Sequence, residues 1–218
     1  MNNGRIAVLC PTRDRLSEFR RMAGSVMGTS AKSDVIFYAD DDQYDLYHGI
    51  EKADGLRGRV RDWYGPRIGP VSACNTLAAK FPEYAVYGMV TDDSVISTPG
   101  WDEWVLETVG VFPNNLCVIS PHHNQGNHVD MPFVTQAWIK STGWFACPTM
   151  YHYAWPTVTS LIGEMTAIVH APAQSFNIDH DYVDGTYPDR REKDNTEFYN
   201  YVSLKMPAVV ERVRAAMS

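Results

Sequence analysis

The chain has 218 residues, of which 44% are hydrophobic, so it is long enough for one domain with a full core and too short for two of ordinary size. Its formal charge of −7 and isoelectric point near 5.4 argue against a protein that coats nucleic acid by electrostatic attraction. The four cysteines form no Cys-x-x-Cys pair, so we expect no disulfide framework and no structural zinc. The first residues lack the layout of a signal peptide, and no apolar run is long enough to span a bilayer. We therefore expect a cytoplasmic protein with no membrane partner.

The first 120 residues alternate between strand-like and helix-like patterns. Apolar, β-prone runs predict strands over residues 5–11, 34–39, 84–90 and 116–120. Helical spacing of apolar side chains predicts helices over residues 16–27, 71–81 and 101–109. Strands that alternate with helices are typical of an α/β fold with a mostly parallel, Rossmann-like sheet and helices on both faces.

The rest of the chain is less regular. Residues 121–133 contain three histidines and no periodicity, which indicates a loop, and residues 166–170 predict a short strand. Because no linker or internal repeat interrupts the sequence, we expect a single domain over residues 1–218.

The C-terminal segment has the pattern of a helix. It is predicted over residues 197–217, with Pro207 restarting it at a first-turn position. Val209, Val210 and Val213 form an apolar stripe, which either covers the sheet or pairs with a second copy, so the oligomeric state stays open.

Polar and charged residues follow three of the predicted strands, at the points where the strands end. They are Pro11, Thr12 and Arg13 after the first strand, Asp40, Asp41 and Asp42 after the second, and Asp92 and Asp93 after the third. In open α/β sheets, ligands bind beyond the carboxyl ends of the strands. We therefore expect these residues to converge on one crevice.

Asp92 and Asp93 are adjacent carboxylates at the mouth of a strand that we expect to be buried. Such a pair suits a hard divalent cation, Mn²⁺ or Mg²⁺, that bridges a diphosphate, because these cations prefer oxygen ligands and buried carboxylates need a cationic partner. Alternatively, the pair belongs to a strand-end turn in which Asp93 caps the following segment.

Several other charged residues suit a nucleotide. A carboxylate after the second strand can accept a hydrogen bond from a nucleobase or a ribose, and the alternative is a solvated turn. Arg13 can contact a phosphate or ribose, the alternative being a surface position at a helix entry. Arg67 lies between Gly65 and Gly69, where the backbone can approach a diphosphate closely, whereas Arg57 and Arg59 fit a solvated charged face better.

One histidine is a candidate metal ligand. His180 follows a strand-like segment and is flanked by acids, and a neutral imidazole is a common third ligand to a metal held by carboxylates. His122, His123 and His128 match no zinc-ligand spacing, so we interpret them as loop residues near a polar site.

The ordered set of motifs resembles the nucleotide-sugar glycosyltransferases of the GT-A fold, family 2-like, and more closely the small glycosyltransferase-like proteins encoded by bacteriophages. The resemblance covers about residues 5–200. Its motifs are Gly-Pro-Arg-x-Gly at residues 65–69, Asn75, Asp92-Asp93, Thr-Pro-Gly-Trp-Asp at residues 98–102, Gly-Trp-Phe-x-x-Pro at residues 143–148, His152-Tyr153, His180, and Asp-x-x-Tyr at residues 184–187.

The resemblance implies a fold and an activity. The chain would form one GT-A domain, in which about residues 1–120 bind the nucleotide and about residues 121–218 bind the acceptor and complete the metal site. It would move a sugar from a nucleotide-diphosphate donor, with a UDP-sugar favoured, to a hydroxyl group. Mn²⁺ or Mg²⁺ would stabilise the charge on the departing diphosphate.

The resemblance also implies roles for single residues. The donor would contact Pro11, Thr12, Arg13, Arg67, Asn75 and Asp92, with Asp40 or Asp41 at the base. Asp93 would be the principal metal ligand and a catalytic residue, Asp92 would contact the ribose or the metal, and His180 would complete the coordination.

The chain departs from this pattern at the expected general base. An inverting transfer needs a group that takes the proton of the acceptor hydroxyl, and the family pattern places an acid near residues 155–157. Here residues 154–157 read Ala-Trp-Pro-Thr. We assign the role to His152; the other candidates are Asp130, Glu164 and Asp179.

Three further hypotheses follow from these observations. The departure keeps open a nucleotide-sugar-binding module that has lost catalysis. A nucleotidyltransferase fits less well, because the loop after the first strand reads Pro-Thr-Arg-Asp-Arg instead of glycine-rich. The acceptor would be a hydroxymethylated pyrimidine in phage DNA, favoured by the arginines and aromatic residues of segment 57–67, or a virion protein, favoured by the acidic charge.

Overall fold

The structure is a computed structural model that describes residues 4–52, 56–123, 131–152, 154–170, 176–180 and 188–218. A seven-stranded sheet, ordered β3-β2-β1-β4-β8-β6-β9, forms its centre. The strands are β1 (Ile6–Thr12), β2 (Ser33–Asp40), β3 (Val60–Gly65), β4 (Val86–Met89), β6 (Val118–Ile119), β8 (Phe133–Thr135) and β9 (Val169–His170). A smaller sheet, ordered β5-β10-β7, contains β5 (Ser94–Ile96), β7 (His122–His123) and β10 (Asn177–His180).

The large sheet is mixed and mostly parallel. β1 pairs in parallel with β2 and β4, β2 pairs in parallel with β3, and β6 pairs in parallel with β9. β8 runs antiparallel to both of its neighbours, β4 and β6. The sheet and its surrounding helices confirm the predicted α/β fold, with β8 as the reversed strand that the sequence pattern did not indicate.

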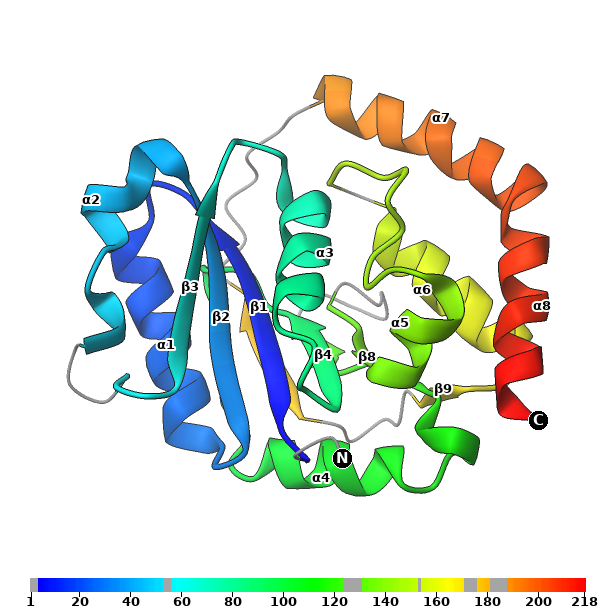
Figure 1. The fold of residues 1–218 in the computed structure, drawn as a ribbon, viewed down its shortest axis with the longest axis horizontal. Helices are drawn as coiled ribbons and strands as arrows, with labels where there is room; N and C mark the ends of the chain where they lie inside the picture. The colour runs from blue at the N-terminus through cyan, green and yellow to red at the C-terminus, as the bar shows by residue number, and fades with distance from the viewer. Residues whose placement is uncertain (1–3, 53–55, 124–130, 153, 171–175, 181–187) are drawn as a thin grey trace.

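The helices divide between the two faces of the sheet (Figure 1). They are α1 (Leu16–Thr29), α2 (Tyr44–Tyr47), α3 (Pro70–Lys80), α4 (Trp101–Val109), α5 (Gln136–Thr142), α6 (Trp155–Met165), α7 (Pro188–Leu204) and α8 (Met206–Met217). Alternate residues of β1 enter different cores, as the period of a strand requires. Ile6, Val8 and Cys10 pack with α1 and α4, whereas Ala7 and Leu9 pack with α3 and the C-terminal helices.

The strands and helices predicted in the first 120 residues are present, with small shifts in bounds. The structure also shows what the apolar stripe of the C-terminal segment covers. Val209, Val210 and Val213 are buried in the core beneath α8, which packs mainly against α5, α6 and α7, so the stripe covers helices of its own domain. Pro207 is the second residue of α8, where the missing N–H costs no hydrogen bond. Within the described part of the chain, the helices are too short or too polar to cross a bilayer.

Other elements were not predicted. The loop expected over residues 121–133 contains β7 and the first residue of β8, with residues 124–130 outside the described part of the chain. α5 and α6 were missed, because the aromatic residues and prolines around them hide the helical period. β3 was missed because arginine and aromatic side chains interrupt its apolar alternation.

β3 is an edge strand of the large sheet, and charged side chains cover it. Arg61 pairs with Glu83, and its guanidinium lies 4.1 Å from the centre of the Phe81 ring. The Lys80 ammonium lies 4.4 Å from the centre of the Trp63 ring. Arg59 donates to the backbone carbonyls of Ser30 and Ser33, so the prediction of a solvated position for this residue was wrong.

Candidate functional site

The predicted convergence of strand ends is present. β1 ends at Thr12 and β2 ends at Asp40, and the turn after β4 carries Asp92 and Asp93. Thr12 Oγ1 donates to Asp92 Oδ2 at 2.8 Å, which links the first strand to that turn. Arg13 links the first strand to the second through Asp40. The carboxyl ends of three parallel strands therefore meet in one polar cluster.

Asp92 and Asp93 share a cationic neighbour, Arg15. Arg15 Nη1 lies 2.9 Å from Asp93 Oδ2 and 3.3 Å from Asp92 Oδ1. Burial raises the pKa of Asp92, and the hydrogen bond from Thr12 and the charge of Arg15 act in the opposite direction. Burial disfavours the charged form of Arg15, but the two carboxylates outweigh it and raise its pKa. The pair is thus a site built to hold a positive charge.

Arg15 is a site residue that sequence reasoning missed. Asp14, between Arg13 and Arg15, has a left-handed backbone (φ 56°), and its N–H donates to Gln43 Oε1 at 3.0 Å. The two arginines therefore contact different acids: Arg13 those after β2, and Arg15 those after β4. The signal in the sequence is the second arginine of Pro-Thr-Arg-Asp-Arg, in the loop directly after the first strand.

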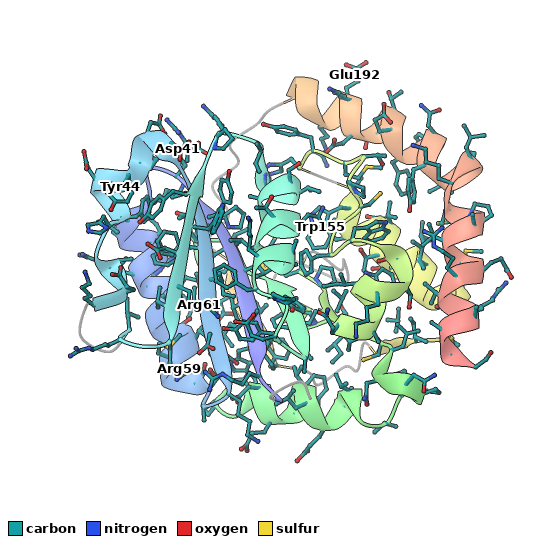
Figure 2. All side chains as sticks on the ribbon, viewed as in Figure 1. Asp41, Tyr44, Arg59, Arg61, Trp155 and Glu192 are labelled. Atoms are coloured by element: carbon teal, nitrogen blue, oxygen red, sulfur yellow. The ribbon has the colours of Figure 1, made fainter. Side chains whose placement is uncertain are left out.

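Arg13 is clamped by the acids after β2. Its Nη1 lies 2.6 Å from both Asp40 Oδ2 and Asp42 Oδ1, and its Nη2 lies 2.7 Å from Asp42 Oδ2. The bond from Arg13 lowers the pKa of Asp42. Asp41 is exposed at the surface beyond the end of β2 (Figure 2). Because solvent screens the outer part of this cluster, a ligand can displace these partners at small cost.

The loop from Gly65 to Pro70 lies between two tyrosines. Tyr38 Oη donates to the carbonyl of Pro66 at 2.7 Å. Gly69 has φ 80°, precedes the first residue of α3, and lies so close to the Tyr151 ring that an added Cβ would be 2.8 Å from it. Arg67 is exposed on this loop, with Nε 3.9 Å from Asp40 Oδ2. The loop therefore presents an arginine beside the acids after β2.

Asn75 binds backbone in this structure. Its Oδ1 accepts from the N–H groups of Phe145 and Ala146 at 2.9 and 3.1 Å, and its Nδ2 donates to the carbonyl of Ala146 at 2.8 Å. The side chain thus ties α3 to the Gly-Trp-Phe-x-x-Pro motif. Its contact with the donor stays a prediction.

His152 lies on a segment that a buried carboxylate holds in place. Asp194 of α7 is 1% exposed, and its two oxygens accept from the N–H groups of Tyr151 and His152, each at 2.8 Å. This acid was not foreseen as a site residue, because it lies in the polar sequence of α7. It fixes the backbone of His152 and places the Tyr151 ring near Gly69.

The position where an acid was expected begins a helix. Ala154 is the N-cap of α6 with a left-handed backbone (φ 54°), and no side chain caps this helix. Trp155 is 1% exposed and lies inside the layer of helices (Figure 2). Glu164 and Asp179 are exposed, and Asp130 lies outside the described residues. The general base stays a prediction at His152.

The remaining metal-ligand candidate is placed through its backbone. His180 pairs with Ser94 across the β10 and β5 strands, which brings its backbone beside the residue that follows Asp93. Its side chain lies outside the described part of the structure. Among the described side chains, no group of three or more His, Cys, Asp or Glu residues could hold a metal ion. Asp92 and Asp93 are the oxygen ligands that a divalent cation would find there.

The arginines of segment 57–67 do not form one patch. Arg59 and Arg61 flank the start of β3, and Arg67 follows its end, with Asp41 near that far end (Figure 2). A strand rises about 3.3 Å per residue, so β3 separates the two ends of the segment. With Arg59 bonded to carbonyls and Arg61 paired with Glu83, Arg67 is the arginine of this segment that lies beside the site.

The structure is similar to several solved structures at low sequence identity. No protein-family model matches the sequence, and none of the curated proteins matches it. The mannosyltransferase PcManGT from Pyrobaculum calidifontis, in complex with GDP-Man and Mn²⁺, aligns with a TM-score of 0.64 at 12% identity, over 97% of this chain and 73% of that one. Residues 1–349 of TarS from S. aureus, in complex with UDP-GlcNAc, align with a TM-score of 0.66 at 12% identity, over 98% of this chain and 71% of that one. This likeness shows the fold: the chain has a GT-A-like α/β architecture.

Proposed function

We propose that the protein is a metal-dependent glycosyltransferase, which moves a sugar from a nucleotide-diphosphate donor to a hydroxyl acceptor. The observation that carries the proposal is the cluster of Thr12, Arg15, Asp92 and Asp93 at the carboxyl ends of parallel strands. Solved structures of similar fold include complexes with GDP-Man and Mn²⁺ and with UDP-GlcNAc. A UDP-sugar is the favoured donor.

The cation would be Mn²⁺ or Mg²⁺, held by Asp93 and Asp92 with His180 as a third ligand. Carboxylate oxygens are the ligands that these cations prefer, and the place of Arg15 between the two carboxylates marks a position suited to positive charge. When bound, the cation would neutralise charge on the departing diphosphate. The residues present therefore suit such a cation because Asp92 and Asp93 offer carboxylate oxygens as ligands.

The other site residues would hold the nucleotide and the acceptor. Pro11 and Thr12 line the end of β1, and Asp40 or Asp41 would accept a hydrogen bond from the base. Arg67 and Arg13 are cationic groups beside the acids after β2, and they can reach a phosphate once these acid partners move. Asn75 would act by holding the Gly-Trp-Phe segment. His152 would accept the proton of the acceptor hydroxyl.

The two acceptor hypotheses differ in the charge they need. DNA binding uses arginine and lysine side chains that are available to phosphates. Arg59 and Arg61 are engaged within the protein, which weakens the case for a hydroxymethylated pyrimidine in phage DNA. With a net charge of −7, the chain favours a hydroxyl on a protein, such as a virion component.

The donor site is tested by calorimetry and thermal shift with UDP, GDP and their sugar conjugates, with and without Mn²⁺. A ligand that binds the folded state raises the melting temperature. We expect a cation-dependent rise with one nucleotide, lost in Asp93→Ala and kept in Glu107→Ala, an exposed carboxylate on α4. No rise with any nucleotide in the presence of Mn²⁺ contradicts the proposal.

Product analysis separates the proposal from its alternatives. A transferase releases the nucleoside diphosphate from its donor when an acceptor is present, and more slowly when water replaces the acceptor. Donor binding without any release identifies a binding module, which the absence of an acid at residues 154–157 favours. Release of pyrophosphate from a nucleoside triphosphate and a sugar phosphate identifies a nucleotidyltransferase.

A further inference from the structure

Tyr47 is a fully buried tyrosine on α2, a short helix that follows the acids after β2. Its ring packs between Phe19 and Phe37, with ring centres 6.0 and 5.6 Å away. The ring is therefore an ordinary part of the core beneath α1. The hydroxyl group is different, because its partners belong to the candidate site.

The hydroxyl of Tyr47 stands in a chain of hydrogen bonds that ends at Asp92. The backbone N–H of Arg15 donates to Tyr47 Oη at 3.0 Å, Tyr47 Oη lies 2.9 Å from Thr12 Oγ1, and Thr12 Oγ1 donates to Asp92 Oδ2 at 2.8 Å. Each hydroxyl has one proton. Because the proton of Thr12 goes to the carboxylate, the proton of Tyr47 goes to Thr12, and Tyr47 accepts from Arg15. The direction of the whole chain is fixed.

Two parts of the site depend on this one hydroxyl. Through Thr12, it fixes the hydroxyl rotor that orients Asp92. Through the backbone of Arg15, it fixes the start of the side chain that bridges Asp92 and Asp93. The Tyr47–Thr12–Asp92 chain is buried, and in a buried network the loss of one member leaves its partners unsatisfied.

We propose that Tyr47 is a positioning residue of the candidate site, whose hydroxyl aligns Asp92 through Thr12 for the donor and its cation, and holds the backbone of Arg15. This inference rests on the proposed function for its link to the donor. Its link to Asp92 stands on the hydrogen bonds alone. Tyr47 does not touch the reacting groups, so it acts through these three residues.

The test is Tyr47→Phe, with Tyr87→Phe as a matched control. Tyr87 is also fully buried, and its hydroxyl donates to the backbone carbonyl of Phe81 at 2.9 Å, a bond outside the site. Each variant removes one hydroxyl and keeps the ring, so we expect both to lower the melting temperature. Calorimetry then measures the affinity for Mn²⁺ alone and for UDP with Mn²⁺. We expect Tyr47→Phe to weaken UDP binding about tenfold, as the loss of one well-formed hydrogen bond does, and Tyr87→Phe to change it less than about twofold.

A second measurement does not need a ligand. The effects of Tyr47→Phe and Asp92→Asn on unfolding in urea are combined in a double-mutant cycle, with Tyr87→Phe and Asp92→Asn as the control cycle. We expect the first pair to be non-additive and the control pair to be additive. Non-additive effects of Tyr47→Phe and Asp92→Asn, together with weakened UDP binding, support the whole inference. Non-additive effects in a protein that binds no nucleotide support the link between Tyr47 and Asp92 but refute the proposed function. Additive effects, or a Tyr47→Phe variant that binds UDP and Mn²⁺ as the wild type does, overturn the inference.

Discussion

The two sides of the candidate site are built from different kinds of hydrogen bond. At the strand ends, the carboxylates of the acids accept from side chains: Asp92 from Thr12, Asp93 from Arg15, and Asp40 from Arg13. On the other side, segment 143–152 is held by side chains that bond to its backbone, from Asn75 on α3 and Asp194 on α7. A ligand can replace a charged side chain as a partner without moving the backbone. We therefore expect the exposed ion pairs of Arg13 to exchange around a donor, whereas the bonds that hold the backbone of segment 143–152 persist.

The largest expected effect is on the fixed side. In Asp194→Ala, the N–H groups of Tyr151 and His152 lose their acceptor, and each buried unsatisfied donor costs about 1–3 kcal/mol, so we expect a loss of about 3 kcal/mol in the free energy of unfolding. Urea denaturation measures it. Glu192→Ala, on an exposed residue that points away from the same helix (Figure 2), should change it by less than about 0.5 kcal/mol. Equal values for the two variants would show that Asp194 does not hold this segment.

A smaller effect is expected where the two sides touch, at Gly69. In Gly69→Ala, the new Cβ would meet the Tyr151 ring in a backbone with φ 80°, so we expect a loss of about 2 kcal/mol in unfolding free energy. Gly100→Ala is the comparison, because Gly100 (φ 73°, ψ 14°) has open space around its Cβ position and reports the milder strain of a left-handed backbone. Gly69 (φ 80°, ψ 161°) lies in a region that essentially only glycine adopts, so its larger loss combines backbone strain with the ring contact. Equal losses in the two variants would contradict both the strained backbone at Gly69 and the tight contact with Tyr151.

The strand-end side is tested through Arg15. In Arg15→Gln, the carboxylates lose the charge that competes with a divalent cation, so we expect affinity for Mn²⁺ alone to rise about five- to tenfold, which corresponds to about 1 kcal/mol. Calorimetry measures it without any donor or activity. Arg20→Gln, an exposed arginine on α1, should leave the affinity unchanged. Weaker binding in Arg15→Gln would mean that Arg15 supports the cation site instead of competing for it.

The smallest effect concerns the start of α6. Ala154 has φ 54°, a conformation that costs an L-residue roughly 1–2 kcal/mol and that glycine adopts freely. After the extra chain entropy of glycine is subtracted, we expect Ala154→Gly to stabilise the protein by about 0.5 kcal/mol. Ala79→Gly, at an exposed position in the last turn of α3, should destabilise it by about 0.5 kcal/mol. A loss of stability in both variants would contradict the left-handed backbone at residue 154.

The sequence predicts the strand ends well because their signals are local. An apolar run followed at once by Asp92 and Asp93, or by Asp40, marks both the strand and the acids beyond it. Arg15 escaped prediction because its partners lie 77 and 78 residues further along the chain. Asp194 escaped because residues 189–197 of its 17-residue helix are all polar, and only its burial separates it from exposed neighbours. Long-range bonds to backbone leave no pattern that a reader of the sequence can recognise.

The two ends of the large sheet also determine how the protein behaves in a crowded solution. An open sheet edge offers unpaired N–H and C=O groups to any passing strand, which is a common route to aggregation. At one edge, β3 carries Arg61 over Phe81 and has Lys80 over Trp63, so an added strand would have to bury charge. At the other edge, the described part of the chain gives β9 two residues, too few to template a stable pairing. The sheet thus resists growth at both edges, and its polar site can stay open to ligands without making the rest of the sheet adhesive.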